Sequence, residues 1–238
     1  MRITTLALVT TLALAGAASA ADLSKAAPAA SPDVAQQAAL YAARQSWPEA
    51  AAAYRQAVAA SPHDASLHNR LGMCYQRLGE VNAARAAYRR ATELRKDYAE
   101  AWNNIGTLEH GRGRYKQAIA AYSRAIGIKP GEAVFYKNLG SAWLARGNVE
   151  KTLEAWNEAL RLDPAALETD AVKVPGGGVD AAKQYFLFAK VAAARGDVER
   201  ALEFLKRAQA AGFNEFAKLE HDADFASIVK DPRYAALK

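Results

Sequence analysis

One column of polar side chains recurs every thirty-four residues, in a pattern that could bind a peptide. The column consists of Gln36, Arg70, Asn104 and Asn138. A carboxamide can donate a hydrogen bond to a peptide carbonyl and accept one from a peptide N–H. Evenly spaced copies could therefore hold a main chain with little regard to its sequence. The alternative is that these side chains bond neighbouring helices or water, as most buried polar groups do.

The side chains that catalysis or metal binding would need do not form a recognisable motif. The histidines, His63, His68, His110 and His221, show neither HExxH nor paired Cys/His spacing. Cys74 is the only cysteine, so no internal disulfide can form. No nucleophile, base and orienting group can be assembled from the pattern. The sequence therefore predicts no metal site, no cofactor and no enzymatic activity.

The elements that must position the polar column are helix pairs with the same period. A small-residue column reads Ala38, Gly72, Gly106 and Gly140, and an aromatic column reads Tyr54, Tyr88, Tyr122 and Trp156. Small residues let two helix backbones approach closely, and the aromatic side chains fill the space beside them. Since one helix pair cannot bury its apolar face, the copies are expected to stack into a solenoid.

The turns within the pairs follow the same period. Gly79, Gly113 and Gly147 stand where the first helix of a pair must end. In the first unit, Ser46-Trp47-Pro48-Glu49 takes the place of this glycine. That segment predicts a capping box, with a proline suited to the first helical turn.

Together these columns resemble the tetratricopeptide repeat, which places an aromatic, Leu-Gly, an aromatic, Ala, an aromatic and Pro in a 34-residue period. The third unit matches best, through Trp102, Ile105, Gly106, Ala118, Tyr122, Ala125 and Pro130. It departs from the pattern at Glu109, where an aromatic residue is usual. The resemblance implies an all-α, right-handed solenoid of helix–turn–helix units over residues 31–64, 65–98, 99–132 and 133–166.

The remaining C-terminal residues predict an insertion, a further unit and a cap. Residues 167–181 contain Pro175-Gly176-Gly177-Gly178, which breaks a helix and predicts a linker or a flap. Residues 182–215 fit a fifth, divergent unit with Ala189, Ala201, Leu205 and Ala208 in the key columns. Residues 216–238 resemble the segment that closes many bacterial tetratricopeptide arrays. They predict a helical cap that covers the last repeat through Phe225, Ile228, Val229, Tyr234 and Leu237.

The N-terminal residues predict export. Arg2, the apolar run 3–15 and the sequence Ala18-Ser19-Ala20 are typical of a secretory signal peptide over residues 1–20. An Ala/Pro/Ser-rich flexible leader is expected over residues 21–30. No later segment is apolar enough to span a bilayer. We therefore expect a periplasmic protein, with secretion to the medium as the alternative.

The charge pattern argues against nucleic acid as a partner. The formal net charge is +6, and removal of Arg2 with the signal peptide would leave +5. Lysines and arginines are scattered through the repeats, which is typical of a solvated helical surface. A protein or peptide partner in the cell envelope is therefore expected.

The resemblance also implies which residues would meet that partner, because the first helix of each tetratricopeptide unit lines a concave face. Asn104 and Asn138 would hold the backbone of an extended segment. The neighbouring candidates for specificity are Arg70, Asn69, Asn103, Lys137, Met73, Thr107 and His110. The predicted function is a non-enzymatic scaffold or adaptor. The alternative is a structural or assembly role through the convex face or the cap, by self-association; the sequence leaves the oligomeric state open.

Overall fold

The computed structural model describes residues 32–168 and 180–237, and within these ranges the chain is all-α, without strands. Antiparallel helix pairs follow one another along the chain. The pairs are α1 (Pro32–Ala43) with α2 (Trp47–Ala60), α3 (Ala65–Arg77) with α4 (Val81–Leu94), α5 (Ala99–Gly111) with α6 (Tyr115–Ile128), α7 (Ala133–Ala145) with α8 (Val149–Leu162), and α9 (Ala181–Ala194) with α10 (Val198–Ala210). The predicted signal peptide, the leader and most of the 167–181 insertion lie outside the described residues.

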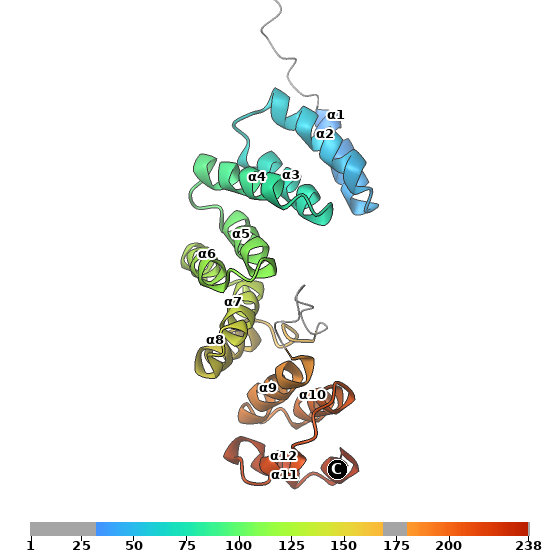
Figure 1. The fold of residues 1–238 in the computed structure, drawn as a ribbon, viewed down its shortest axis with the longest axis vertical. Coiled ribbons are helices and arrows are strands. Elements are labelled where there is room, and N and C mark those ends of the chain that lie inside the picture. Colours follow the sequence, from blue (N-terminus) through green and yellow to red (C-terminus); the bar gives the residue numbers. More distant parts are fainter. Residues whose placement is uncertain (1–31, 169–179, 238) are drawn as a thin grey trace, which may run out of the picture.

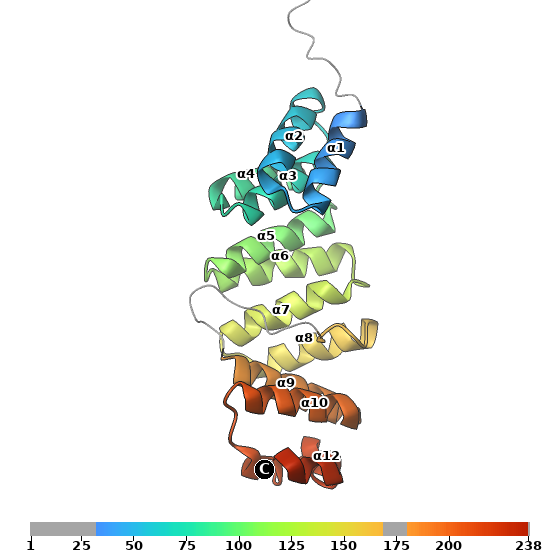
Figure 2. The same ribbon diagram turned by 90° about the vertical axis from the view of Figure 1, so that its right-hand side faces the viewer.

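The pairs stack into an elongated array, with α1 and α2 at one end and the C-terminus at the other (Figure 1). The second helix of a pair packs against the first helix of the next, as in α2 with α3, α4 with α5, and α6 with α7. A view turned by 90° shows α5 to α10 as successive layers (Figure 2). The prediction of an all-α solenoid is confirmed. No helix in the described ranges is long and apolar enough to cross a membrane.

The turns inside the pairs use one left-handed residue each. Gly79, Gly113 and Gly147 have φ of 77°, 70° and 75°, values that glycine adopts without the penalty a Cβ imposes. In the first unit Gln45 takes this place, with φ of 59°. The predicted capping box is wrong, because the Ser46 side chain makes no capping hydrogen bond. Pro48 at the second helical position removes one of the two N–H groups that a cap could bind.

The small-residue column sets the close contact between the two helices of a pair. A Cβ added to its glycines would lie far inside van der Waals distance of the aromatic ring in the partner helix. The added Cβ would lie 2.6 Å from the nearest Tyr88 ring atom at Gly72, 2.5 Å from that of Tyr122 at Gly106, and 2.4 Å from that of Trp156 at Gly140. These rings are themselves almost completely buried. The close approach predicted from the column is confirmed.

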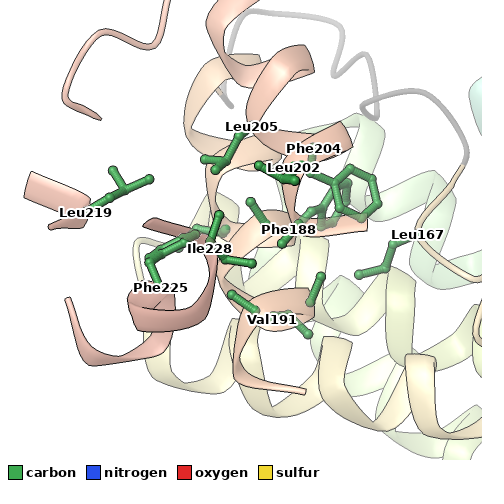
Figure 3. Close-up of a cluster of buried hydrophobic side chains, with 14 of the residues drawn as sticks. Leu167, Phe188, Val191, Leu202, Phe204, Leu205, Leu219, Phe225 and Ile228 are labelled. Carbon is green, nitrogen blue, oxygen red and sulfur yellow. The ribbon is translucent and has the colours of Figure 1, made fainter. Parts of the chain in front are cut away.

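A single apolar cluster joins the fourth pair, the fifth pair and the C-terminal segment (Figure 3). This segment consists of α11 (Phe216–Leu219), the 3-10 helix η1 (Ala223–Phe225), α12 (Ala226–Val229) and the 3-10 helix η2 (Pro232–Leu237). As expected of a cap, the side chains of Phe225, Ile228, Tyr234 and Leu237 are buried in the cluster, and Val229 is partly buried against it. Lys190 of α9 also forms ion pairs with Asp222 and Asp224 in the segment.

Candidate binding site on the first helices

A cavity of about 490 Å³ lies along the first helices of the second, third and fourth pairs. The residues that line it include Asn69, Arg70 and Met73 of α3, Asn103 and Asn104 of α5, and Phe135 of α7. We call it the first-helix cavity. It brings together five of the side chains that the sequence proposes for partner binding.

Asparagine side chains connect successive units beside this cavity. Asn104 Nδ2 donates to Asn69 Oδ1 at 2.9 Å, and Asn138 Nδ2 donates to Asn103 Oδ1 at the same distance. Asn104 and Asn138 therefore each bond the preceding unit, as the alternative interpretation of the polar column expects. A carboxamide has two N–H donors and an acceptor oxygen, so one such bond does not exhaust its capacity to bind a peptide.

Asn69 occupies the interior of this network. Its side chain is buried, and its Nδ2 lies 3.4 Å from the hydroxyl of Tyr98, to which it donates. The carboxamide thus links Tyr98, which directly precedes α5, to Asn104 on the same helix. Asn69 is placed to orient these two side chains rather than to present its own amide to a ligand.

The charges of the first-helix cavity differ along the array. Arg70 is exposed, and its Nη1 donates to the Tyr54 hydroxyl at 3.4 Å. This hydrogen bond raises the pKa of the Arg70 guanidinium, so the α3 part of the cavity carries a fixed positive charge. Glu100 and Glu132 supply negative charge toward α7, where Lys129 contacts both carboxylates. Such a wall suits a ligand of mixed charge.

The wall between these charges is largely apolar. Met73 and Val134 are each 47% exposed, which is unusual for large apolar side chains, and Phe135 lies beside Val134. Exposed apolar side chains that line a cavity are more informative than scattered ones, because they offer a ligand surface that water solvates poorly.

Four predicted site residues do not line the first-helix cavity: Thr107, His110, Lys137 and Asn138. The Thr107 hydroxyl donates to the Asn103 carbonyl at 3.1 Å and accepts from Tyr122. The His110 side chain is buried edge-on against the Tyr115 ring at 5.3 Å. Lys137 is partly buried, and burial lowers the pKa of its ammonium group. The side chains of Thr107 and His110 therefore contact residues of the third pair away from the cavity, whereas Asn138 bonds Asn103 beside it.

Sequence reasoning missed the aromatic and acidic groups at the ends of helices. Tyr98 and Glu132 occupy the N-cap positions of α5 and α7 and both line the cavity. Tyr54 belongs to the aromatic packing column, yet its hydroxyl reaches Arg70. Tyr98 and Glu132 are thirty-four residues apart, so their column could have been found by extending the search to the residues that precede each first helix.

Burial of His110 predicts a dependence of stability on pH. Burial lowers the pKa of its imidazole below the ordinary value of 6.5, and Nε2 is buried without a hydrogen-bond partner in the described ranges. The native state therefore binds a proton more weakly than the unfolded state. This contribution to stability is complete above pH 6.5 and is lost as the pH falls through the lowered pKa.

Thermal unfolding between pH 5 and 7 tests the effect. The unfolding temperature of the wild type should rise more steeply with pH than that of His110→Gln. His221→Gln is the matched control, because His221 is exposed, and it should keep the wild-type slope. Equal slopes for all three proteins would contradict the assignment.

Comparison with known families identifies the repeat. Residues 75–133 match the sequence model of the family described as tetratricopeptide repeat, and residues 38–79 match a second one described as TPR repeat. No protein among the curated sequences matches the chain. With the helix pairs described above, these matches show that residues 38–133 consist of tetratricopeptide repeats.

Solved structures share the fold at low sequence identity. PilF of Pseudomonas aeruginosa is 20% identical with a TM-score of 0.59, and the alignment covers 86% of each chain. PilW, described as a widely conserved type IV pilus biogenesis factor, is 19% identical with a TM-score of 0.57, and the alignment covers 86% of this chain and 88% of PilW. YrrB, described as a TPR protein with an unusual peptide-binding site, is 16% identical with a TM-score of 0.53, and the alignment covers 84% of this chain and 95% of YrrB. Tetratricopeptide repeat proteins generally bind proteins or peptides.

Proposed function

We propose that the chain is a non-enzymatic adaptor of the cell envelope that holds an extended segment of a partner protein in the first-helix cavity. The observation that carries the proposal is the cavity itself, in which the asparagine network lies beside exposed apolar side chains. The amide groups of Asn103 and Asn104 offer hydrogen bonds to a main chain, while Met73 and Val134 offer contacts to its side chains. The similarity to YrrB, described as a TPR protein with an unusual peptide-binding site, supports the same use of the fold.

The envelope location rests on the N-terminal sequence. The segment 1–20 has the layout of a cleavable signal peptide, and we propose residence in the periplasm. Within the described residues no group of His, Cys, Asp and Glu side chains is placed to hold a metal ion. The large apolar side chains of the C-terminal cap pack inward, so we favour the cavity over the cap as the partner surface.

Site-directed photocrosslinking in cells tests the proposal. A photoreactive amino acid at Met73 would sit in the first-helix cavity, whereas one at the exposed Arg89 of α4 would sit away from it. A defined partner should be captured from the envelope fraction at position 73 and not at position 89. The mass of the captured chain also reports whether residues 1–20 have been removed.

The second arm of the experiment repeats the capture in an Asn104→Ala/Asn138→Ala background. Capture at position 73 should fall about tenfold or more, because the amide contact of Asn104 to the partner is lost and Asn103 loses the Asn138 amide that orients its side chain. The same two side chains bond Asn69 and Asn103, so circular dichroism must show unchanged helicity at the temperature of the assay. Undiminished capture in a folded double variant, or equal capture at position 89, would refute the use of this cavity.

A further inference from the structure

A second cavity, of about 590 Å³, lies between α4, α5 and α6. Three arginines line it, Arg85, Arg114 and Arg124, together with Glu109, Trp102 and Ile105. We call it the arginine pocket. Three positive charges and one negative charge leave its wall with a net charge of +2.

The arginine pocket and the first-helix cavity use opposite sides of α5. An α-helix turns by about 100° per residue. The α5 residues of the first-helix cavity are Glu100, Asn103 and Asn104, and those of the arginine pocket are Trp102, Ile105 and Glu109. The two sets therefore project about 180° apart. The two cavities share no lining residue, so a ligand in one does not occupy the other.

Glu109 organises the pocket because it departs from the repeat pattern. The equivalent residues of the other units are Tyr41, Tyr75 and Trp143, so a carboxylate replaces a large ring. The Glu109 side chain is only 8% exposed; Oε1 accepts from Arg85 Nε at 2.8 Å, and Oε2 lies 3.5 Å from Arg114 Nη1. One buried carboxylate thus holds two guanidinium groups at the wall of the space that a ring would fill.

The guanidinium groups retain hydrogen-bonding capacity. Arg85 Nη2 is buried and has no hydrogen-bond partner within residues 32–168 and 180–237. Arg124 is exposed, and in the same ranges its side chain makes no hydrogen bond or ion pair. A buried donor without a partner is unfavourable. Rotation of the partly exposed Arg85 guanidinium toward an incoming carboxylate would satisfy this donor with a charge-assisted bond.

The fourth unit provides an internal comparison. Its residues thirty-four positions later line a smaller pocket of about 230 Å³, in which Trp143 stands for Glu109 and Glu158 for Arg124. Lys151, Glu154 and Glu158 give that pocket a net charge of −1. The larger volume and the positive charge therefore distinguish the third unit from the fourth, and the repeat architecture does not require them.

We propose that the arginine pocket binds an acidic side chain of a partner protein, with a neighbouring aliphatic side chain of that partner packed on Trp102 and Ile105. The charge of the pocket complements a carboxylate. Its apolar wall distinguishes a protein segment from a free inorganic anion, which would gain nothing from an indole and an isoleucine. This interface is independent of the proposed function of the first-helix cavity.

Nuclear magnetic resonance titration of the purified, isotope-labelled protein tests the proposal. The probes are the peptide acetyl-Leu-Glu-Leu-amide, its neutral match acetyl-Leu-Gln-Leu-amide, and inorganic phosphate. The acidic peptide should shift the Trp102 indole N–H and the Ala120 and Ala121 amides, which belong to the pocket wall. The neutral peptide should bind about tenfold more weakly, because a hydrogen bond to a charged group is replaced by a neutral one.

Matched variants complete the test. Arg124→Gln should weaken the acidic peptide about tenfold, whereas Arg89→Gln removes the same charge from another exposed position of the second helices and should have no effect. Equal binding of the two peptides, retained affinity in Arg124→Gln, or shifts confined to Asn103 and Asn104 would overturn the proposal. So would phosphate that matches the acidic peptide in affinity and in the residues shifted.

Discussion

Replacement of Trp156 by alanine is expected to lower the free energy of unfolding by about 3–5 kcal/mol. The Trp156 side chain is completely buried, and the centroid of its ring lies 4.4 Å from that of the Phe188 ring in the next pair. Its Nε1 also donates to the Lys137 carbonyl at 3.1 Å. The substitution would therefore open a cavity in the cluster that joins the fourth pair to the fifth and would remove a buried hydrogen bond.

We expect one part of the Trp156→Ala protein to unfold before the rest of the array does. In a stacked array each unit is stabilised mainly by its neighbours. The contact between α8 and α9 is less extensive than the equivalent contacts of α2 with α3, α4 with α5 and α6 with α7. Urea unfolding of Trp156→Ala should therefore begin with the fifth pair and the cap. Circular dichroism across urea concentration, with limited proteolysis at the first transition, would locate the segment that unfolds.

Trp143→Ala is the matched control, because Trp143 is a tryptophan of α7 in the same pair and is only partly buried. Arg146 and Lys151 lie over its ring at 5.5 and 4.6 Å. These contacts are largely solvated, so the loss should be about 1–2 kcal/mol. A similar loss of unfolding free energy for both substitutions would show that Trp156 does not join the fourth pair to the fifth.

Gly106→Ala is expected to destabilise the protein by about 1–3 kcal/mol through overpacking. Alanine would favour the helix by about 1 kcal/mol over glycine. However, its Cβ would lie 2.5 Å from Cε1 of the Tyr122 ring. That ring is 2% exposed and its hydroxyl donates to Thr107 at 3.3 Å, so it cannot rotate away without losing contacts. The overpacking cost should therefore exceed the gain in helix propensity.

Gly127→Ala separates packing from propensity. Gly127 lies in α6, and a Cβ there would meet nothing within 4 Å. This substitution should raise the free energy of unfolding by up to about 1 kcal/mol, and the urea midpoint should rise with it. If Gly106→Ala also raised the midpoint, the close approach of α5 and α6 would not be a structural requirement.

The sequence alone determined the repeated elements of the fold. The 34-residue recurrence of Gly72, Gly106 and Gly140 with their aromatic partners predicts paired helices in close contact, because the residues of one pair are close in sequence. Likewise, the apolar residues of the tail predict a cap, since an exposed last repeat must be covered. The columns also placed Asn103, Asn104 and Arg70 on first helices, where a cavity is found.

Only the tertiary structure decided what those side chains contact. Asn104 bonds Asn69 and Asn138 bonds Asn103 across thirty-five residues, which depends on how far each unit rotates relative to the last. The period specifies the residues of a unit but not this rotation. The same angle determines that Tyr98 reaches the first-helix cavity while His110 is buried. It also brings Arg85 to Glu109. The Glu109 carboxylate, which departs from the repeat pattern, therefore lies in the wall of a basic pocket.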